Sequence, residues 1–205
     1  DLEAVARFFH ERVLGQDEAV EAVVDLISLV KAGLTDPTRP LGVLFFVGPT
    51  GVGKTEMAKA VAEFIFGSAD RLVRIDLGEF KEADSHRRLT GDPLAPDPAA
   101  RFGLLTAPVR ERPFSVVLLD EMEKAHRNVF DLLLPLMAEG RLIDEQGRVT
   151  DFRRTIIVMT SNLGSDLRED LFLGFGATTE GDSGGPPDGA HAKVQRVMEE
   201  AFRPE

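Results

Sequence analysis

Short apolar runs alternate with amphipathic stretches along most of the chain. Continuous apolar runs of this length are typical of strands that are buried on both faces of a parallel sheet. The expected strands cover residues 43–47, 72–75, 114–119 and 155–160. Apolar residues at helical spacing predict helices over 2–12, 17–32, 54–66, 102–112, 128–138 and 190–202. The alternation predicts an α/β fold in which helices cover both faces of a mainly parallel sheet.

Proline and glycine mark the expected interruptions. Pro108 and Pro135 fall inside two expected helices, where a proline removes a hydrogen bond and costs about 3 kcal/mol in an unadapted interior. Three prolines between residues 92 and 98 predict a loop, and Gly147 lies in a predicted hairpin over 141–152. Residues 177–190 are rich in glycine, proline and aspartate, so we expect a flexible loop there.

A glycine-rich motif links the first expected strand to the helix that begins at Lys54. From Gly48 to Thr55 it reads Gly-Pro-Thr-Gly-Val-Gly-Lys-Thr, which fits the phosphate-binding pattern G-x-x-x-x-G-K-[ST]. In such a loop backbone N–H groups point at phosphate oxygens, Lys54 adds positive charge toward the β- and γ-phosphates, and the Thr55 hydroxyl can hold Mg²⁺. A turn that binds nothing does not need Lys54 and Thr55, so the motif predicts a nucleotide site.

Acidic and amide side chains follow two of the other strands. Asp120 and Glu121 come directly after an apolar strand, and Asn162 follows another. Ligands bind at the carboxyl ends of parallel strands. We therefore expect Asp120 to act on Mg²⁺ through its water shell and Glu121 to orient or deprotonate an attacking water. Asn162 is expected to place that water or contact the γ-phosphate, and the alternative is that it caps the next turn.

Composition and charge narrow the class of protein. At 205 residues the chain is long enough for one sizeable core. Its net charge of −11 argues against a nucleic-acid site dominated by phosphate contacts, and the absence of cysteine excludes disulfides and thiolate metal sites. The four histidines are scattered singly, so they do not predict a metal site. We expect a cytoplasmic protein with neither a nucleic-acid nor a membrane partner.

Taken together, these motifs resemble the ATPase domain of Clp-type AAA+ unfoldases and disaggregases, particularly their second ATPase module. The resemblance covers nearly the whole chain and also rests on residues 14–20, 119–126, 140–142, 149–153 and 159–165. It implies an AAA+ large α/β subdomain over residues 1–205, with a helical lead-in over 1–40. That subdomain is a P-loop NTPase three-layer sandwich with a mainly parallel five-stranded sheet, and it works in a hexameric ring.

The resemblance also implies the cofactors and the site residues. The cofactors are ATP and Mg²⁺. Nucleotide-binding residues are Val13 and Leu14 near the adenine, then Pro49, Thr50, Gly51, Val52, Gly53, Lys54, Thr55, Glu56 and Asp120. The implied metal ligands are Thr55 and Asp120, and the implied catalytic residues are Glu121, Lys54 and Asn162.

The chain departs from the family pattern at two places. Similar proteins present Gly-Tyr-Val-Gly to the central pore, where the aromatic grips a threaded polypeptide, but the same four positions here are Ala95-Pro96-Asp97-Pro98. The chain has no Tyr or Trp, and Phe102 is the nearest aromatic, so we expect a stiff, acidic loop tip without apolar grip. We also expect the chain to end before the arginine finger and the helical lid, so that it binds nucleotide but hydrolyses it poorly.

Three functions stay open at this point. The first is an ATP-hydrolysing module that remodels or unfolds protein substrates within a homohexameric ring, with a possible adaptor or protease partner. The second is a nucleotide-gated assembly or scaffold protein that threads nothing, for which the departure at Ala95-Pro96-Asp97-Pro98 argues. The third is a nucleic-acid motor, against which the acidic balance and the lack of Tyr and Trp weigh.

Overall fold

The computed structural model describes residues 2–13, 17–48, 51, 53–162 and 173–174. Several sequence predictions fall outside these residues. They are the flexible loop over 177–190, the helix over 190–202, the end of the chain, and the candidate site residues Leu14, Pro49, Thr50 and Val52.

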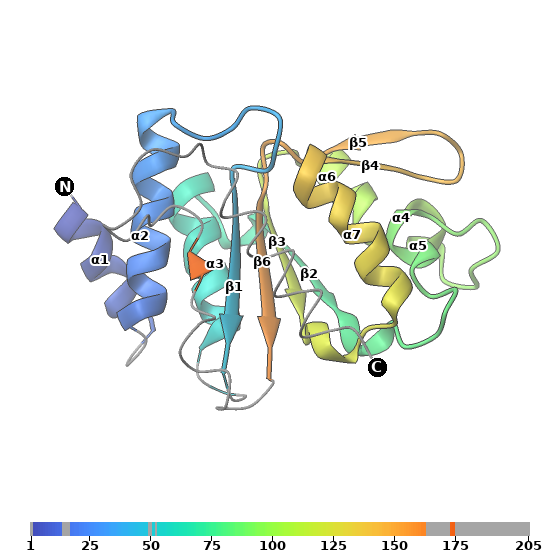
Figure 1. Cartoon of the computed structure of the whole chain (residues 1–205), viewed down its shortest axis with the longest axis horizontal. Coiled ribbons are helices and arrows are strands. Elements are labelled where there is room, and N and C mark those ends of the chain that lie inside the picture. The colour runs from blue at the N-terminus through green and yellow to red at the C-terminus, as the bar shows by residue number, and fades with distance from the viewer. Residues whose placement is uncertain (1, 14–16, 49–50, 52, 163–172, 175–205) are drawn as a thin grey trace, which may run out of the picture.

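A five-stranded sheet with the order β2-β3-β6-β1-β7 runs through the molecule (Figure 1). Its four longer strands are parallel: β1 (Gly42–Val47), β2 (Leu72–Asp76), β3 (Val116–Asp120) and β6 (Ile156–Ser161). The short strand β7 (Leu173–Gly174) pairs antiparallel with β1. The predicted α/β fold with a mainly parallel five-stranded sheet is therefore confirmed.

Helices cover both faces of this sheet, which gives three layers (Figure 1). On one face lie α1 (Leu2–His10), α2 (Asp17–Ala32) and α3 (Lys54–Phe66), and on the other lies α7 (Arg127–Glu139). Alternation along each strand supplies both faces, because Val43 and Phe45 pack toward α7 whereas Leu44 and Phe46 pack toward α2 and α3. Strands buried on both faces explain why their sequences read as continuous apolar runs.

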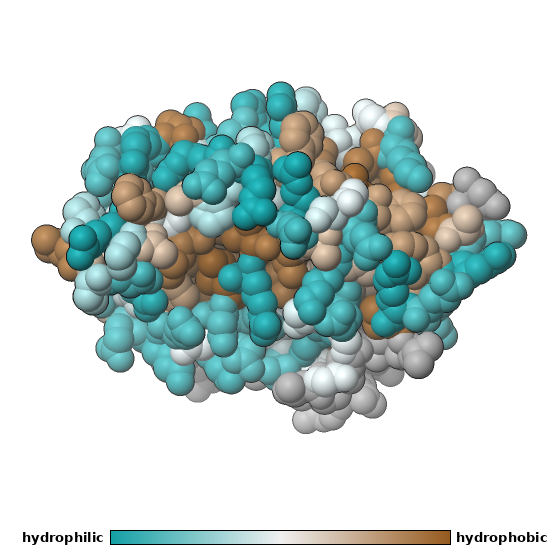
Figure 2. All heavy atoms as spheres, turned by 180° about the vertical axis from the view of Figure 1, so that it is seen from behind, coloured by the Kyte–Doolittle hydropathy of each residue, from teal (hydrophilic) through white to brown (hydrophobic). Residues whose placement is uncertain are grey.

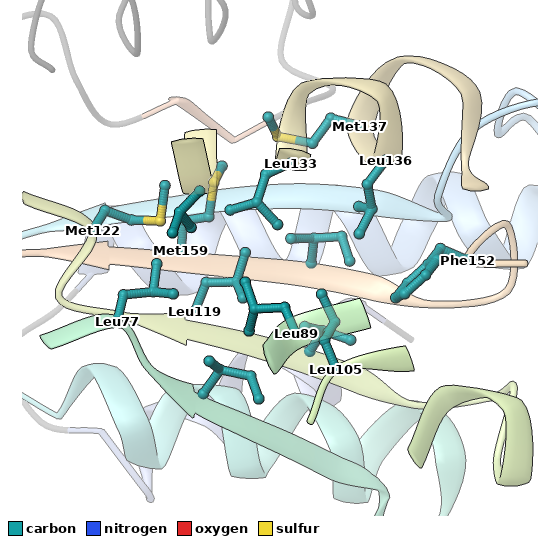
Figure 3. Packing of buried hydrophobic residues seen from close by; sticks show 14 of the residues in the cluster. Leu77, Leu89, Leu105, Leu119, Met122, Leu133, Leu136, Met137, Phe152 and Met159 are labelled. Carbon is teal, nitrogen blue, oxygen red and sulfur yellow. The ribbon is translucent and has the colours of Figure 1, made fainter. Parts of the chain in front are cut away.

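Leucine and methionine side chains from α7 and from the sheet pack together in the core beneath α7 (Figure 3). Leu133, Leu136 and Met137 of α7 face Leu119 and Met159 of the sheet, and all five side chains are buried. Phe152 closes one end of this cluster. Pro135 lies inside α7 as predicted, and the helix nevertheless keeps its buried stripe.

The expected helix over 102–112 is wrong. Two short helices stand there, α5 (Pro98–Phe102) and α6 (Thr106–Glu111), with α4 (Arg87–Thr90) beside them. Gly103 separates α5 from α6 in the left-handed region with φ of 96°, a conformation that strongly favours glycine. Pro108 is the third residue of α6, where the helix makes no use of a backbone N–H, so the expected cost of a proline in a helix interior does not apply.

The segment before α5 is a hydrogen-bonded turn that exposes both an apolar residue, Leu94, and the predicted acidic residue, Asp97. Ala95 is buried at 4% exposure, whereas the Leu94 side chain is 88% exposed. Asp97 caps α5 by accepting a hydrogen bond from the Ala99 N–H, and the Arg101 guanidinium donates to the Ala95 carbonyl over 2.7 Å. These hydrogen bonds tie the turn to α5, and Leu94 adds an exposed apolar side chain to it.

The remaining described elements are short. They are a hairpin of β4 (Arg141–Ile143) and β5 (Val149–Asp151), and the 3₁₀ helices η1 (Ala69–Arg71), η2 (Leu77–Glu79) and η3 (Met122–Lys124). Figure 2 shows hydrophilic side chains over most of the rear face, with apolar ones gathered near its centre. Among the helices that the structure describes, none is long and apolar enough to span a membrane.

Candidate nucleotide site

Candidate residues from separate parts of the sequence meet at the carboxyl edge of the sheet. β6 pairs in parallel with both β1 and β3, so the segments that follow these three strands lie side by side. Lys54 begins α3 after β1, Asp120 ends β3, and Asn162 follows β6. The structure therefore brings together Lys54, Asp120, Glu121 and Asn162, which the sequence motifs had singled out.

The Lys54 ammonium group is held by three oxygen acceptors. It donates to the Gly48 carbonyl over 2.6 Å, to the Ser161 carbonyl over 3.0 Å and to Asn162 Oδ1 over 2.6 Å. Burial lowers the pKa of Lys54 below its ordinary value, although the neighbouring carboxylates act in the opposite direction. A partly buried ammonium of this kind favours an anionic ligand, because a phosphate would stabilise its charged form.

The N-terminus of α3, which begins at Lys54, presents the backbone N–H groups of its first turn. Gly53 is the N-cap with φ of 96° and supplies no capping side chain, and the first helical bond runs from the Met57 N–H to the Gly53 carbonyl over 2.8 Å. The amides of the first helical turn therefore have no acceptor within the helix. Val13 packs so close to this turn that a Cβ on Gly53 would lie 3.0 Å from its Cγ1. These features fit a phosphate group at the helix N-terminus.

Asp120 is anchored through both of its carboxylate oxygens. Oδ1 accepts a hydrogen bond from the Thr160 hydroxyl over 2.5 Å, and Oδ2 accepts one from the Arg74 guanidinium over 2.7 Å. The same Thr160 hydroxyl accepts the Glu121 N–H over 3.1 Å. One buried hydroxyl on β6 thus fixes both acidic residues at the end of β3.

Glu121 adopts the left-handed conformation, with φ of 59° and ψ of 53°. It is the only non-glycine with positive φ among the described residues. Its Oε1 accepts a hydrogen bond from Asn162 Nδ2 over 3.1 Å, and its Oε2 accepts one from Lys124 Nζ over 2.6 Å. Asn162 therefore links Lys54 to Glu121 through its own amide group.

Glu123 supports the backbone of Asn162. Its Oε1 accepts the Asn162 N–H over 3.2 Å, while its buried Oε2 has no hydrogen-bond partner in the part of the chain that the structure describes. Sequence reasoning missed Glu123, Lys124, Arg74 and Thr160. A signal existed for Lys124, which follows Glu121 at the three-residue spacing of one 3₁₀ turn.

The other candidate residues lie at varying distance from this cluster. Thr55 stands in the first turn of α3, but Glu56 is exposed there and its Oε1 accepts a hydrogen bond from Lys59 over 2.7 Å. Across the described ranges, no group of three His, Cys, Asp or Glu side chains is placed to hold a metal ion. Mg²⁺ in nucleotide sites uses one or two protein oxygens together with phosphates, so Thr55 and Asp120 remain compatible with it.

Comparison with known proteins identifies the family. Residues 39–205 match the family described as AAA domain (Cdc48 subfamily). Over 197 residues the chain is 48% identical to the Negative regulator of genetic competence ClpC/MecB of Bacillus subtilis (strain 168). The chain belongs to the Clp-type AAA+ ATPases. The predicted family is thereby confirmed, and ATP is the nucleotide that membership of this ATPase family implies.

Other relatives of this Clp-type AAA+ domain have related names. The chain is 47% identical over 200 residues to the Chaperone protein ClpB of Oceanobacillus iheyensis. It is 45% identical over 197 residues to the ATP-dependent Clp protease ATP-binding subunit ClpC of Staphylococcus saprophyticus. These alignments cover 96–97% of this chain but 24% of each relative. The chain thus spans about a quarter of the length of the relatives that it matches.

Proposed function

We propose that this domain binds and hydrolyses ATP with Mg²⁺, and that it drives the remodelling or unfolding of protein substrates from within a homohexameric ring. The observation that carries the proposal is the hydrogen-bonded series Lys54, Asn162 and Glu121 beside the uncapped N-terminus of α3. It joins a phosphate-binding group to a carboxylate at the edge of the sheet where ligands bind.

Each residue has a distinct part in the proposed reaction. Lys54 and the first amides of α3 bind phosphate oxygens, while Asn162 contacts the γ-phosphate or the attacking water. Glu121 orients that water and accepts its proton, a contribution typically worth about 10²–10⁴-fold in rate. Thr55 and Asp120 would hold Mg²⁺, which supplies positive charge to the phosphates when it is bound. Val13 and Leu14 are proposed to lie near the adenine, with Pro49, Thr50, Gly51, Val52, Gly53 and Glu56 completing the nucleotide contacts.

The proposed partners rest on the relatives. Two of them are named as a chaperone and as the ATP-binding subunit of a Clp protease, which supports protein substrates and an adaptor or protease partner. An Arg that completes the site from a neighbouring subunit accelerates related phosphate chemistry by about 10³–10⁵-fold, which favours activity in a ring over activity of a single domain. The cytoplasmic location stays a prediction.

Nucleotide binding and turnover of the full-length protein test the site. We expect Lys54→Ala to abolish binding of Mg·ATP, because it removes the ammonium that faces the phosphates. We expect Glu121→Gln to keep binding and to lower turnover by about 10²-fold or more. Lys31→Ala, which changes an exposed lysine at the end of α2, is the control. Unchanged binding and turnover in Lys54→Ala would show that the site lies elsewhere.

A nucleotide-gated scaffold protein remains the second candidate function, because the segment before α5 is fixed by Asp97 and Arg101.

The exposed Leu94 favours the ATP-driven unfolding module instead, since it offers apolar contact to a substrate. We expect Leu94→Ser to slow ATP-dependent unfolding of a tagged protein several-fold and to leave basal ATPase activity unchanged. Leu34→Ser is the matched control, since Leu34 is also exposed, at 72%. ATP-dependent assembly without any unfolding by the wild type would establish the scaffold.

A further inference from the structure

Lys124 makes the shortest hydrogen bond that Glu121 receives. Its Nζ lies 2.6 Å from Glu121 Oε2, whereas Asn162 Nδ2 lies 3.1 Å from Oε1. The Lys124 backbone N–H also donates to the Glu121 carbonyl over 3.0 Å. Lys124 therefore binds Glu121 through both its side chain and its backbone, within the single turn of η3.

The two partners of the Glu121 carboxylate differ in what else they contact. Asn162 shares its amide with Lys54, through a 2.6 Å bond to Oδ1. A phosphate that draws Lys54 toward itself would therefore disturb Asn162 and its bond to Oε1. Lys124 has no such link to Lys54 in the described structure, and the side-chain hydrogen bond to Glu121 raises the pKa of Lys124, so it stays charged. Glu121 Oε2 thus keeps its hydrogen bond from Lys124 when Oε1 loses its hydrogen bond from Asn162.

We propose that Lys124 is a positioning residue that holds Oε2 of Glu121 and thereby leaves Oε1 as the oxygen that receives the proton from water. The inference rests on the proposed function and assigns separate roles to the two oxygens of one carboxylate. Asn162 donates a hydrogen bond to Oε1 in this structure and releases that oxygen when a phosphate recruits Lys54. Lys124 keeps the carboxylate in place throughout.

The pair of Lys124 and Glu121 differs from an ordinary ion pair on the protein surface. Pairs between exposed side chains add little stability, because two long side chains lose entropy for a screened attraction. The Glu121 side chain, however, is only 24% exposed. The Glu121 backbone also has left-handed dihedral angles, so its side chain leaves the chain in a different direction from that of a residue in the right-handed helical region. The pair therefore acts on the orientation of Glu121 more than on the stability of the fold.

Steady-state kinetics of the full-length protein test this role. We expect Lys124→Met to lower kcat by about 10–100-fold, since a displacement of about 1 Å at a reacting group can cost 10²-fold. We expect Lys124→Arg to recover most of this loss, because it restores a charged donor. The affinity for a non-hydrolysable ATP analogue with Mg²⁺, measured by calorimetry, should change less than twofold. The control Arg127→Met removes another positive charge nearby, from an exposed residue that pairs only distantly, at 3.9 Å, with Asp131.

A second background separates positioning from a loss of folding. In Glu121→Gln, the further change Lys124→Met should alter turnover less than twofold, because both act through the same carboxylate. Lys124→Gln, which keeps a donor without the charge, should fall between wild type and Lys124→Met.

Two results would overturn the assignment. One is turnover by Lys124→Met as fast as that of Arg127→Met, and the other is an equal loss in the Glu121→Gln background. Neither result would touch the proposed function, which fails instead if Lys54→Ala binds and hydrolyses ATP normally.

Discussion

Replacing Thr160 by valine tests how the two acidic residues at the end of β3 are held. The Thr160 hydroxyl is buried, donates to Asp120 Oδ1 and accepts the Glu121 N–H. Valine keeps the shape and removes both bonds. A hydrogen bond to a charged group contributes about 1.5–3 kcal/mol and a neutral one about 0.5–1.5. The extra apolar methyl group offsets about 0.8 kcal/mol.

We therefore expect Thr160→Val to lower the free energy of unfolding by about 2 kcal/mol. For a chain of this size that corresponds to a fall in Tm of about 4–8 °C. The matched control is Thr155→Val on the segment leading into β6. Thr155 is equally buried but donates only to the neutral Phe152 carbonyl, over 2.7 Å. With the same offset from the added methyl group, we expect a loss of less than about 0.7 kcal/mol there.

Thermal unfolding and ATP turnover are the two assays. Turnover should fall in Thr160→Val because Glu121 loses its backbone anchor, and it should stay unchanged in Thr155→Val. A Tm for Thr160→Val equal to or above that of Thr155→Val, together with normal turnover, would refute the view that this hydroxyl positions the acidic residues.

Two further predictions concern the fold. A Cβ on Gly103 would lie 2.2 Å from Thr106 Oγ1 and 2.7 Å from the Thr90 carbonyl, so Gly103→Ala should lower the free energy of unfolding by about 3 kcal/mol. Gly147→Ala is the control: a Cβ there would meet no atom within 4 Å, and we expect a loss of about 1 kcal/mol. Urea unfolding measures both losses, and equal losses would contradict this prediction. Burial tends to raise the pKa of Asp144, but hydrogen bonds from Arg148 and the Gln146 amide outweigh it and lower that pKa. The stability that Asp144 adds is thus present above its unfolded-state pKa of about 3.9 and is lost as pH falls through the lower folded pKa. Asp144→Asn should therefore have a lower free energy of unfolding than the wild type at pH 7, and that free energy should change less with pH below pH 4. The same pH dependence below pH 4 in both proteins would contradict this prediction.

The boundaries of an element were predicted best where sequence signals mark both of its ends. The helix over 54–66 was predicted to the residue, because the phosphate-binding motif precedes it and Gly67 follows it in the left-handed region. The strand cores were also predicted correctly, since apolar runs end at polar or turn residues. The helix over 102–112 was wrong because its break depends on tertiary bonds. The amides of Leu104 and Leu105 donate to carbonyls of α4, and no local pattern shows this.

The residues that meet at the carboxyl edge of the sheet could be selected from the sequence, but the contacts between them could not. Motif and strand-end position were enough to select Lys54, Asp120, Glu121 and Asn162. The pairing of Arg74 with Asp120 could not be predicted, because it requires β2 to lie beside β3 in parallel register. Thr160 gave a weak signal as a polar residue in an apolar strand.

The backbone conformation of Glu121 sets the demands of folding against those of the proposed chemistry at one position. A residue with a side chain in the left-handed region costs about 1–3 kcal/mol, and glycine would remove that cost. A search for more stable variants would therefore tend to replace Glu121 and lose its carboxylate. Under the proposed function, a search for stabilised but active variants would therefore exclude residue 121 and seek gains in the two cores instead.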